Sequence, residues 1–168
     1  DYSNDMMVLN NGDRIVAGQT YSNDGDFEGQ LKGASSAFIS RYDSSGKLLH
    51  TQLLGGTRID SYDYASSVAA LEDGGYVVAG GYQEGDGVDP TGDFAQLKTD
   101  GSVHGGIDGF LAKYDKDNNL VWMKNFSGSE HDQIKQIRAT KDGGIAALVE
   151  TLSNDGDMQD LNKGLFGV

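Results

Sequence analysis

The amino-acid sequence repeats itself with a period of about seventy residues. Residues 11–18 recur as residues 73–80 and, more loosely, as residues 142–148. Residues 38–56 recur as residues 110–128. The spacing between copies varies, which indicates a fixed framework with loops of different length. A chain of this kind is expected to fold as an array of similar supersecondary units, each burying its apolar faces against its neighbours.

Each repeat is expected to form four short β-strands. In the second copy, the apolar segments 64–71, 76–82, 110–114 and 120–126 have the length of ordinary strands and are separated by turn residues. The Asp-Gly-Gly turn at 73–75 supplies the positive φ that a tight hairpin needs. Twenty-five glycines, one proline and no long 3.6-residue period favour an all-β fold. The predicted architecture is a series of four-stranded antiparallel blades.

Four motifs of the second copy indicate the kind of repeat. They are Leu-Gly-Gly at 54–56, Asp-Tyr-Ala-Ser-Ser-Val at 63–68, Asp-Gly-Gly-Tyr-Val-Val-Ala-Gly-Gly at 73–81 and Asp-Gly-Phe-Leu-Ala-Lys-Tyr-Asp at 108–115. With these motifs the chain resembles the bacterial β-propeller repeat family called the seven-bladed propeller, or SBBP-type, repeat. The resemblance covers nearly the whole chain, although the third copy is degenerate. It implies a four-stranded blade and an extracellular or cell-surface setting, and it brings no catalytic residue.

The chain holds about two and three quarters of these units, namely residues 1–56, residues 57–128 and a partial third unit at 129–168. Propellers usually have about 4 to 8 blades, so we expect that this chain does not close a ring alone. The sequence stops inside an expected third strand at 164–167. We therefore expect the remaining blades to come from a longer parent chain or from self-association, since uncovered apolar faces and strand edges favour association.

The composition is strongly acidic and contains no cysteine. Thirteen basic and 26 acidic residues give a net charge of −13. This charge argues against binding nucleic acid or an anionic membrane, and no apolar stretch predicts membrane insertion. The lack of cysteine excludes a disulfide scaffold and a thiolate metal site, but it is compatible with secretion.

The topology of an up-and-down blade gathers the acidic residues at one end. Short turns share one end, whereas the second-to-third loops and the links between blades share the other. These long segments, 22–35, 57–63, 83–107, 129–132 and 153–163, hold fifteen acidic residues against four basic ones. Because variable loops on a rigid scaffold commonly bind ligands, we expect an acidic rim that binds a protein or a glycan. The candidate ligand-binding residues are Asp60, Asp63, Glu84, Asp86, Asp89 and Asp132.

A repeated acidic motif adds the alternative of a calcium site. Ser-Asn-Asp-Gly-Asp occurs at 22–26 and 153–157, and we expect its middle copy at 84–87. Closely spaced carboxylates around a glycine suit Ca²⁺. The motif lacks a full EF-hand loop, so an Asx-rich turn without metal is the favoured interpretation, and no other cofactor is predicted. The candidate calcium ligands are Asp24, Asp26, Asp155 and Asp157.

Two functions remain open at this point. The first is a non-catalytic extracellular module that acts as a scaffold or as a binding or adhesion surface through its acidic rim. The second is a fragment of a polysaccharide-active propeller enzyme with catalytic carboxylates among the rim acids, about 5 to 9.5 Å apart. The sequence has many acids but no privileged pair, no G-x-S-x-G elbow and no P-loop. The non-catalytic module is therefore favoured, and no catalytic residue is predicted.

Overall fold

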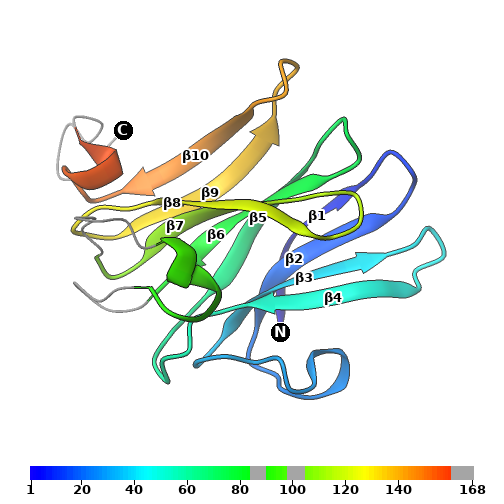
Figure 1. Ribbon diagram of the computed structural model, residues 1–168, viewed down its shortest axis with the longest axis horizontal. Helices are drawn as coiled ribbons and strands as arrows, with labels where there is room; N and C mark the ends of the chain where they lie inside the picture. The colour runs from blue at the N-terminus through cyan, green and yellow to red at the C-terminus, as the bar shows by residue number, and fades with distance from the viewer. Residues whose placement is uncertain (84–89, 98–104, 160–168) are drawn as a thin grey trace.

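The chain is all-β, as the sequence predicts. The computed structural model describes residues 1–83, 90–97 and 105–159. In these residues the chain forms three antiparallel sheets, of four, four and two strands, together with three short 3-10 helices. The sheets lie side by side in the order of the sequence and do not close into a ring (Figure 1).

Each sheet is built from consecutive strands. The first sheet contains β1 (Tyr2–Val8), β2 (Arg14–Thr20), β3 (Ser36–Tyr42) and β4 (Leu48–Leu54). The second contains β5 (Tyr64–Ala70), β6 (Tyr76–Tyr82), β7 (Asp108–Tyr114) and β8 (Leu120–Phe126). The third contains β9 (Asp132–Ala139) and β10 (Ile145–Thr151). The 3-10 helices are η1 (Gly25–Phe27), η2 (Gly92–Leu97) and η3 (Gly156–Met158). All four strands expected in the second copy are thus confirmed, with small differences at their ends.

The sheets stack through their first strands. β5 packs against β1, β2 and β3, and β9 packs in the same way against β5, β6 and β7. We call the face that a sheet turns toward the preceding sheet its leading face, and the opposite face its trailing face. Every junction therefore joins the trailing face of one sheet to the leading face of the next.

The connections divide between two ends of the stack. The tight turns at 9–13, 43–47, 71–75, 115–119 and 140–144 form one end, which we call the hairpin end (Figure 1). The longer connections leave the sheets at the opposite end, which we call the long-loop end (Figure 1). The turn between β5 and β6 is closed by a hydrogen bond from Gly74 N–H to Leu71 O, at 3.1 Å, and Gly74 has a φ of 84°. The predicted positive φ in this turn is confirmed.

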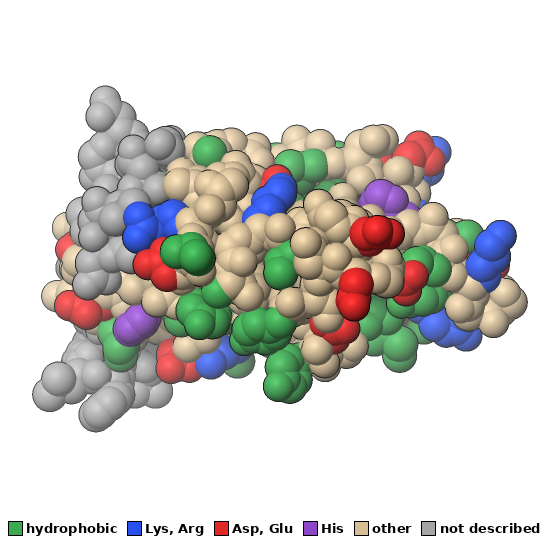
Figure 2. All heavy atoms as spheres, turned by 90° about the horizontal axis from the view of Figure 1, so that it is seen from below, with side chains coloured by type: hydrophobic (Ala, Val, Ile, Leu, Met, Phe, Trp, Pro, Cys, Tyr) green, Lys and Arg blue, Asp and Glu red, His purple; other side chains and the backbone are tan. Residues whose placement is uncertain are grey.

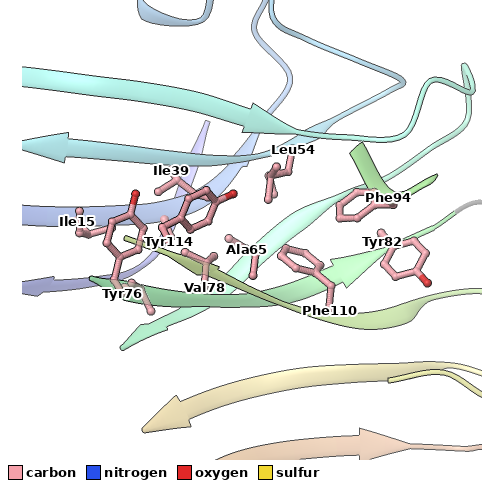
Figure 3. Close-up of a cluster of buried hydrophobic side chains, with 14 of the residues drawn as sticks. Ile15, Ile39, Leu54, Ala65, Tyr76, Val78, Tyr82, Phe94, Phe110 and Tyr114 are labelled. Carbon is pink, nitrogen blue, oxygen red and sulfur yellow. The ribbon is translucent and has the colours of Figure 1, made fainter. Parts of the chain in front are cut away.

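The main core lies between the first two sheets and is rich in aromatic rings. Tyr76 and Tyr114 stack with ring centroids 5.2 Å apart at the hairpin end. Toward the other end, the ring of Phe94 lies 4.7 Å from that of Tyr82 and 5.2 Å from that of Phe110 (Figure 3). All five rings are almost completely buried. Aromatic burial of this size is a large part of what holds the two sheets together.

A second core lies between the second and third sheets. Ile134 and Ile137 of β9 are buried against Val77, Ala79 and Leu111 of the second sheet. The β-branched residues on these strands fit a pleated surface that is covered by another sheet. Alternate residues of a first strand face opposite sides of its sheet. A first strand between two other sheets can therefore contribute to the junction on each side.

Arg41 crosslinks the first two sheets near the hairpin end. Its guanidinium forms an ion pair with Asp13, at 2.7 Å, in which the side chains are only 11% and 13% exposed. The hydrogen bonds of Arg41 lower the pKa of the Asp13 carboxyl. Arg41 Nη1 also donates to the backbone carbonyl of Lys116 at 2.6 Å and to Asn118 Oδ1 at 3.2 Å. One side chain therefore satisfies groups on both sheets.

Replacing Arg41 by methionine is expected to reduce the free energy of unfolding by about 3 kcal/mol, because Asp13 would keep a largely buried charge without its partner. Lys113 occupies the equivalent strand position in the second sheet and pairs with the more exposed Asp73. Lys113→Met is the matched control and should cost less than about 1 kcal/mol. Urea denaturation measures both values, and equal losses would contradict the structural role of Arg41.

Candidate functional site

Asp63, a predicted rim residue, is buried at the start of β5. None of its surface is exposed (0%). Its Oδ2 accepts a hydrogen bond from Gly56 N–H at 2.8 Å, and its Oδ1 accepts one from Gln83 N–H at 3.2 Å. The carboxylate therefore joins the end of the first sheet to the loop that follows β6. Its side chain lies inside the fold and not on the surface of the rim.

Asp132 holds the same place at the start of β9 and is also 0% exposed. Its Oδ1 accepts a hydrogen bond from Thr151 Oγ1 at 2.5 Å. In the first sheet, Asp1 Oδ1 accepts one from Thr20 Oγ1, also at 2.5 Å. An aspartate thus stands at the start of the first strand of all three units and bonds to the unit's own second strand or to the loop after it.

The predicted calcium ligands of the third unit bind the backbone that follows β8. Asp157 Oδ2 accepts a hydrogen bond from Ser127 N–H at 3.2 Å, and Asp157 N–H donates to Ser127 O at 2.9 Å. Asp155 Oδ1 accepts one from Ser129 N–H at 2.8 Å. These two carboxylates therefore attach the third unit to the end of the second sheet.

The second unit makes the same attachment to the first sheet through η2. Asp93 Oδ2 accepts a hydrogen bond from Gly55 N–H at 2.9 Å, and Asp93 N–H donates to Gly55 O at 3.1 Å. Thr91 Oγ1 accepts one from Thr57 N–H at 2.9 Å. The middle copy of the acidic motif is therefore at 91–93, whereas the segment 84–87 expected to carry it lies outside the described residues. We call the contacts of Asp93 and Asp157 the junction clamps.

Each junction clamp is positioned by a glycine whose backbone has a left-handed conformation. Gly92 and Gly156 both have a φ of 57°, which other residues rarely adopt. A Cβ atom on either glycine would collide with the backbone carbonyl of Gly55 or of Ser127, respectively. The motif needs glycine both for the turn and for the close approach to the preceding sheet.

The first copy of the motif forms the same turn but clamps nothing in the described chain. Gly25 has a φ of 59°, and Asp24 and Asp26 are exposed. No described residue donates a hydrogen bond to either carboxylate. Phe27 is half-buried against Phe38, with ring centroids 5.4 Å apart. The difference from the later copies follows from the lack of a described sheet in front of the first one.

The remaining predicted rim residues fall into two groups. Asp60 is exposed (64% of its side chain) and pairs with the neighbouring Arg58 at 3.1 Å. Glu84, Asp86 and Asp89 lie outside the described residues. On the face seen in Figure 2, acidic side chains are spread among hydrophobic and polar ones. The structure thus separates the predicted rim into buried aspartates, exposed aspartates and a segment that it does not describe.

The candidate calcium ligands do not come together. In the described ranges 1–83, 90–97 and 105–159, no three acidic, histidine or cysteine side chains converge on a point that could hold a metal ion. Asp24 and Asp26 belong to the first unit, and Asp155 and Asp157 are engaged by the backbone of the second. Calcium also needs about 6 to 8 oxygen ligands. Of the four candidates, Asp155 and Asp157 are parts of a junction between units.

Asp108 is a buried carboxyl that sequence reasoning missed. It begins β7, is 2% exposed, and pairs across the sheet with Tyr82 just as Ser36 pairs with Thr20 in the first sheet. Burial raises the pKa of Asp108 to about 8, and the negative charge of Asp132 adds to the rise. A polar residue at the equivalent position of the first two sheets was the available signal, but the acid itself appears in only one of these two sheets.

Two grooves are present at the hairpin end, between adjacent sheets. The groove between the first and second sheets has a volume of about 400 Å³ and includes Arg41 and Lys116. The groove between the second and third sheets has a volume of about 360 Å³ and includes Lys113 and Lys141. Asp73 lines both. These grooves repeat with the sheets, and they lie at the end opposite to the predicted rim.

Comparison with known proteins adds no relative. No protein-family model matches the sequence, and no curated protein is significantly similar to it. The likeness to the propeller repeat family therefore stays a prediction from the motifs. Among the described residues, no helix is long and apolar enough to cross a membrane.

Asp93→Ala is expected to lower the free energy of unfolding by about 2 kcal/mol, because Gly55 N–H loses its acceptor and Lys32 loses its ion pair. Asp26→Ala removes the same carboxylate from the unclamped copy and should change stability by less than about 0.5 kcal/mol. Thermal and urea denaturation of the whole chain provide the comparison. Similar losses in both variants would show that the clamp does not depend on the neighbouring sheet.

Asp108→Asn is expected to flatten the pH dependence of stability. The pKa of Asp108 is about 8 in the folded chain against an ordinary value of 3.8, so folding favours the protonated form. The stabilisation from Asp108 is full below the lower value and is lost as pH rises through about 8. Denaturation at about pH 5.5 and about pH 8.5 should show a smaller loss in the variant than in the natural chain.

Asp60→Asn is the control for this experiment, because the Asp60 carboxyl is exposed and Arg58 lowers its pKa. Asp60 is therefore expected to change the pH dependence of stability only at acid pH, below the range of this experiment. An unchanged slope in Asp108→Asn would mean that Asp108 does not titrate in this range.

Proposed function

We propose that the chain is a non-catalytic, extracellular β-propeller-type repeat module that acts as a scaffold and as a binding or adhesion surface. The main support for this proposal comes from the contacts that the repeated acidic residues make. Asp63, Asp93, Asp132 and Asp157 all accept hydrogen bonds within the stack of sheets. Acids engaged in this way serve to hold a framework in one geometry, which is what a scaffold requires.

The acids that we expect to meet a partner are exposed ones at the long-loop end. They are Asp24, Asp26, Glu28, Asp60 and Glu130, all exposed. Together with a net charge of −13, they favour a partner with cationic or hydroxyl groups, such as a basic protein surface or a glycan. They do not favour nucleic acid. Loops on a rigid sheet framework are a common place for such binding.

The alternative is a polysaccharide-active enzyme, and Asp108 is the residue that gives it support. Its raised pKa, of about 8, is the property expected of a general acid, and Asp132 is close enough to influence it. However, Asp108 is 2% exposed and Asp132 is 0% exposed. A sugar cannot reach buried carboxyls, so the non-catalytic module has the stronger support.

A glycan array probed with the labelled whole chain tests the proposal. We expect binding that becomes at least about tenfold weaker in the triple variant Asp24→Asn, Asp26→Asn, Glu28→Gln, which removes about three charges from the long-loop end. The matched control is Asp117→Asn, Asp142→Asn, Glu72→Gln, because these three acids are exposed at the hairpin end. Its binding should be unchanged.

Three results would count against the proposal. The first is the absence of binding to any glycan or basic protein. The second is binding that both variants weaken equally, which would point to net charge alone. The third is release of reducing ends from a polysaccharide that disappears in Asp108→Asn, which would replace the module by the enzyme.

A further inference from the structure

The first strand of each sheet carries a β-bulge that reaches the next sheet. The register of β1 shifts between Ser3 and Asp5, and the register of β5 shifts between Ala65 and Ser67. At the bulge, Asn4 Nδ2 donates to Ala65 O at 2.8 Å. In the next junction the equivalent donor is the Ser66 hydroxyl, which donates to Ile134 O at 2.5 Å. The bulged residue is therefore a donor toward the following sheet in both junctions.

The residue after the bulge is an acceptor in both junctions. Asp5 Oδ2 accepts a hydrogen bond from Val68 N–H at 3.0 Å. Ser67 Oγ accepts one from Ile137 N–H at 3.2 Å. Each trailing face thus presents a donor followed by an acceptor, and each leading face presents a carbonyl and, three residues later, an N–H group.

The third sheet presents the next pair in this series on a trailing face that no described residue covers. Its bulge lies between Ile134 and Gln136, so that Lys135 takes the donor position and Gln136 the acceptor position. Both side chains are exposed. Leu148 lies on the same face, where its equivalent in the second sheet is Ala79; Leu148 is 62% exposed and Ala79 is 0% exposed.

The first sheet presents the matching leading face, against which no sheet of the described chain packs. Met6 occupies the position of Val68 and Ile137, paired across to the second strand in the same register. Val68 is 5% exposed and Ile137 is 1% exposed, whereas Met6 is 57% exposed. Val8 beside it is 56% exposed. One chain therefore carries an exposed leading face with the apolar residues Met6 and Val8, and an exposed trailing face on which Lys135, Gln136 and Leu148 take the positions that bond and pack in its own junctions.

We propose that the leading face of the first sheet, centred on Met6 and Val8, is the docking site for the trailing face of β9 and β10 of a second copy of this chain. Lys135, whose Nζ pairs with Glu150 at 3.1 Å in the single chain, would also donate to the carbonyl of Ser3. Gln136 would accept from Met6 N–H, which in the single chain donates to Asp5 Oδ1 at 2.9 Å. Leu148 would cover Met6. Because two different faces meet, the contact is head-to-tail, and it extends to a ring or a filament according to the rotation between copies.

The docking site goes beyond the proposed function. It is tested by the mass of the particle in solution and not by glycan binding. In sedimentation velocity the natural chain should grow in mass as its concentration is raised. Met6→Lys blocks the leading face and Leu148→Lys blocks the trailing face, so each variant alone should stay at the 17.9 kDa of one chain. An equal mixture retains one intact pair of faces and should give a species of about twice that mass, with no further growth.

Ile59→Lys is the control, because Ile59 is 92% exposed but lies in the loop before β5, away from both faces. It should assemble like the natural chain, and circular dichroism should show that all variants fold. A natural chain that stays monomeric at every concentration overturns the proposal. So does a dimer of Leu148→Lys alone, which would mean that two leading faces meet each other, or a mixture that remains monomeric.

Discussion

The stacked sheets depend on one kind of hydrogen bond. A backbone N–H group at the end of a fourth strand donates it to a carboxylate of the next unit. Gly55, Gly56 and Ser127 leave the hydrogen-bond ladder of their sheets at a place that the following unit covers. A covered N–H group without an acceptor is costly. Apolar packing stabilises the contact between the sheets, whereas the carboxylates of Asp63, Asp93 and Asp157 fix the alignment of one sheet on the next.

This arrangement changes the meaning of the acidic composition. A net charge of −13 suggests a solvated surface, and part of the acid content does lie there. Other acids lie inside: Asp63 and Asp132 expose nothing, and Asp108 is protonated around neutral pH because burial raises its pKa to about 8. The net negative charge at the surface of the folded chain is therefore smaller than the net charge calculated from its sequence.

Strands and turns could be predicted from the sequence because their causes are local. The segments 76–82 and 120–126 coincide with β6 and β8, and the glycine turn at 73–75 has the expected geometry. The fate of the acids could not be predicted, because it depends on another unit. Asp26 and Asp157 sit in the same five-residue motif and the same 3-10 turn, yet of the two only Asp157 is bonded to a neighbouring sheet in the described chain, through Ser127. The difference is the sheet in front of them.

The bulges of β1 and β5 give the stack a direction. At the bulges, a unit donates from side chains on its trailing face to backbone carbonyls of the next sheet, as Asn4 and Ser66 do toward Ala65 and Ile134. A backbone carbonyl is present whatever the side chain, so at these contacts the receiving strand tolerates sequence change better than the donating one. A gene that gains or loses one whole repeat thus leaves every remaining junction chemically intact, and such an array can change length in evolution without inventing a new interface.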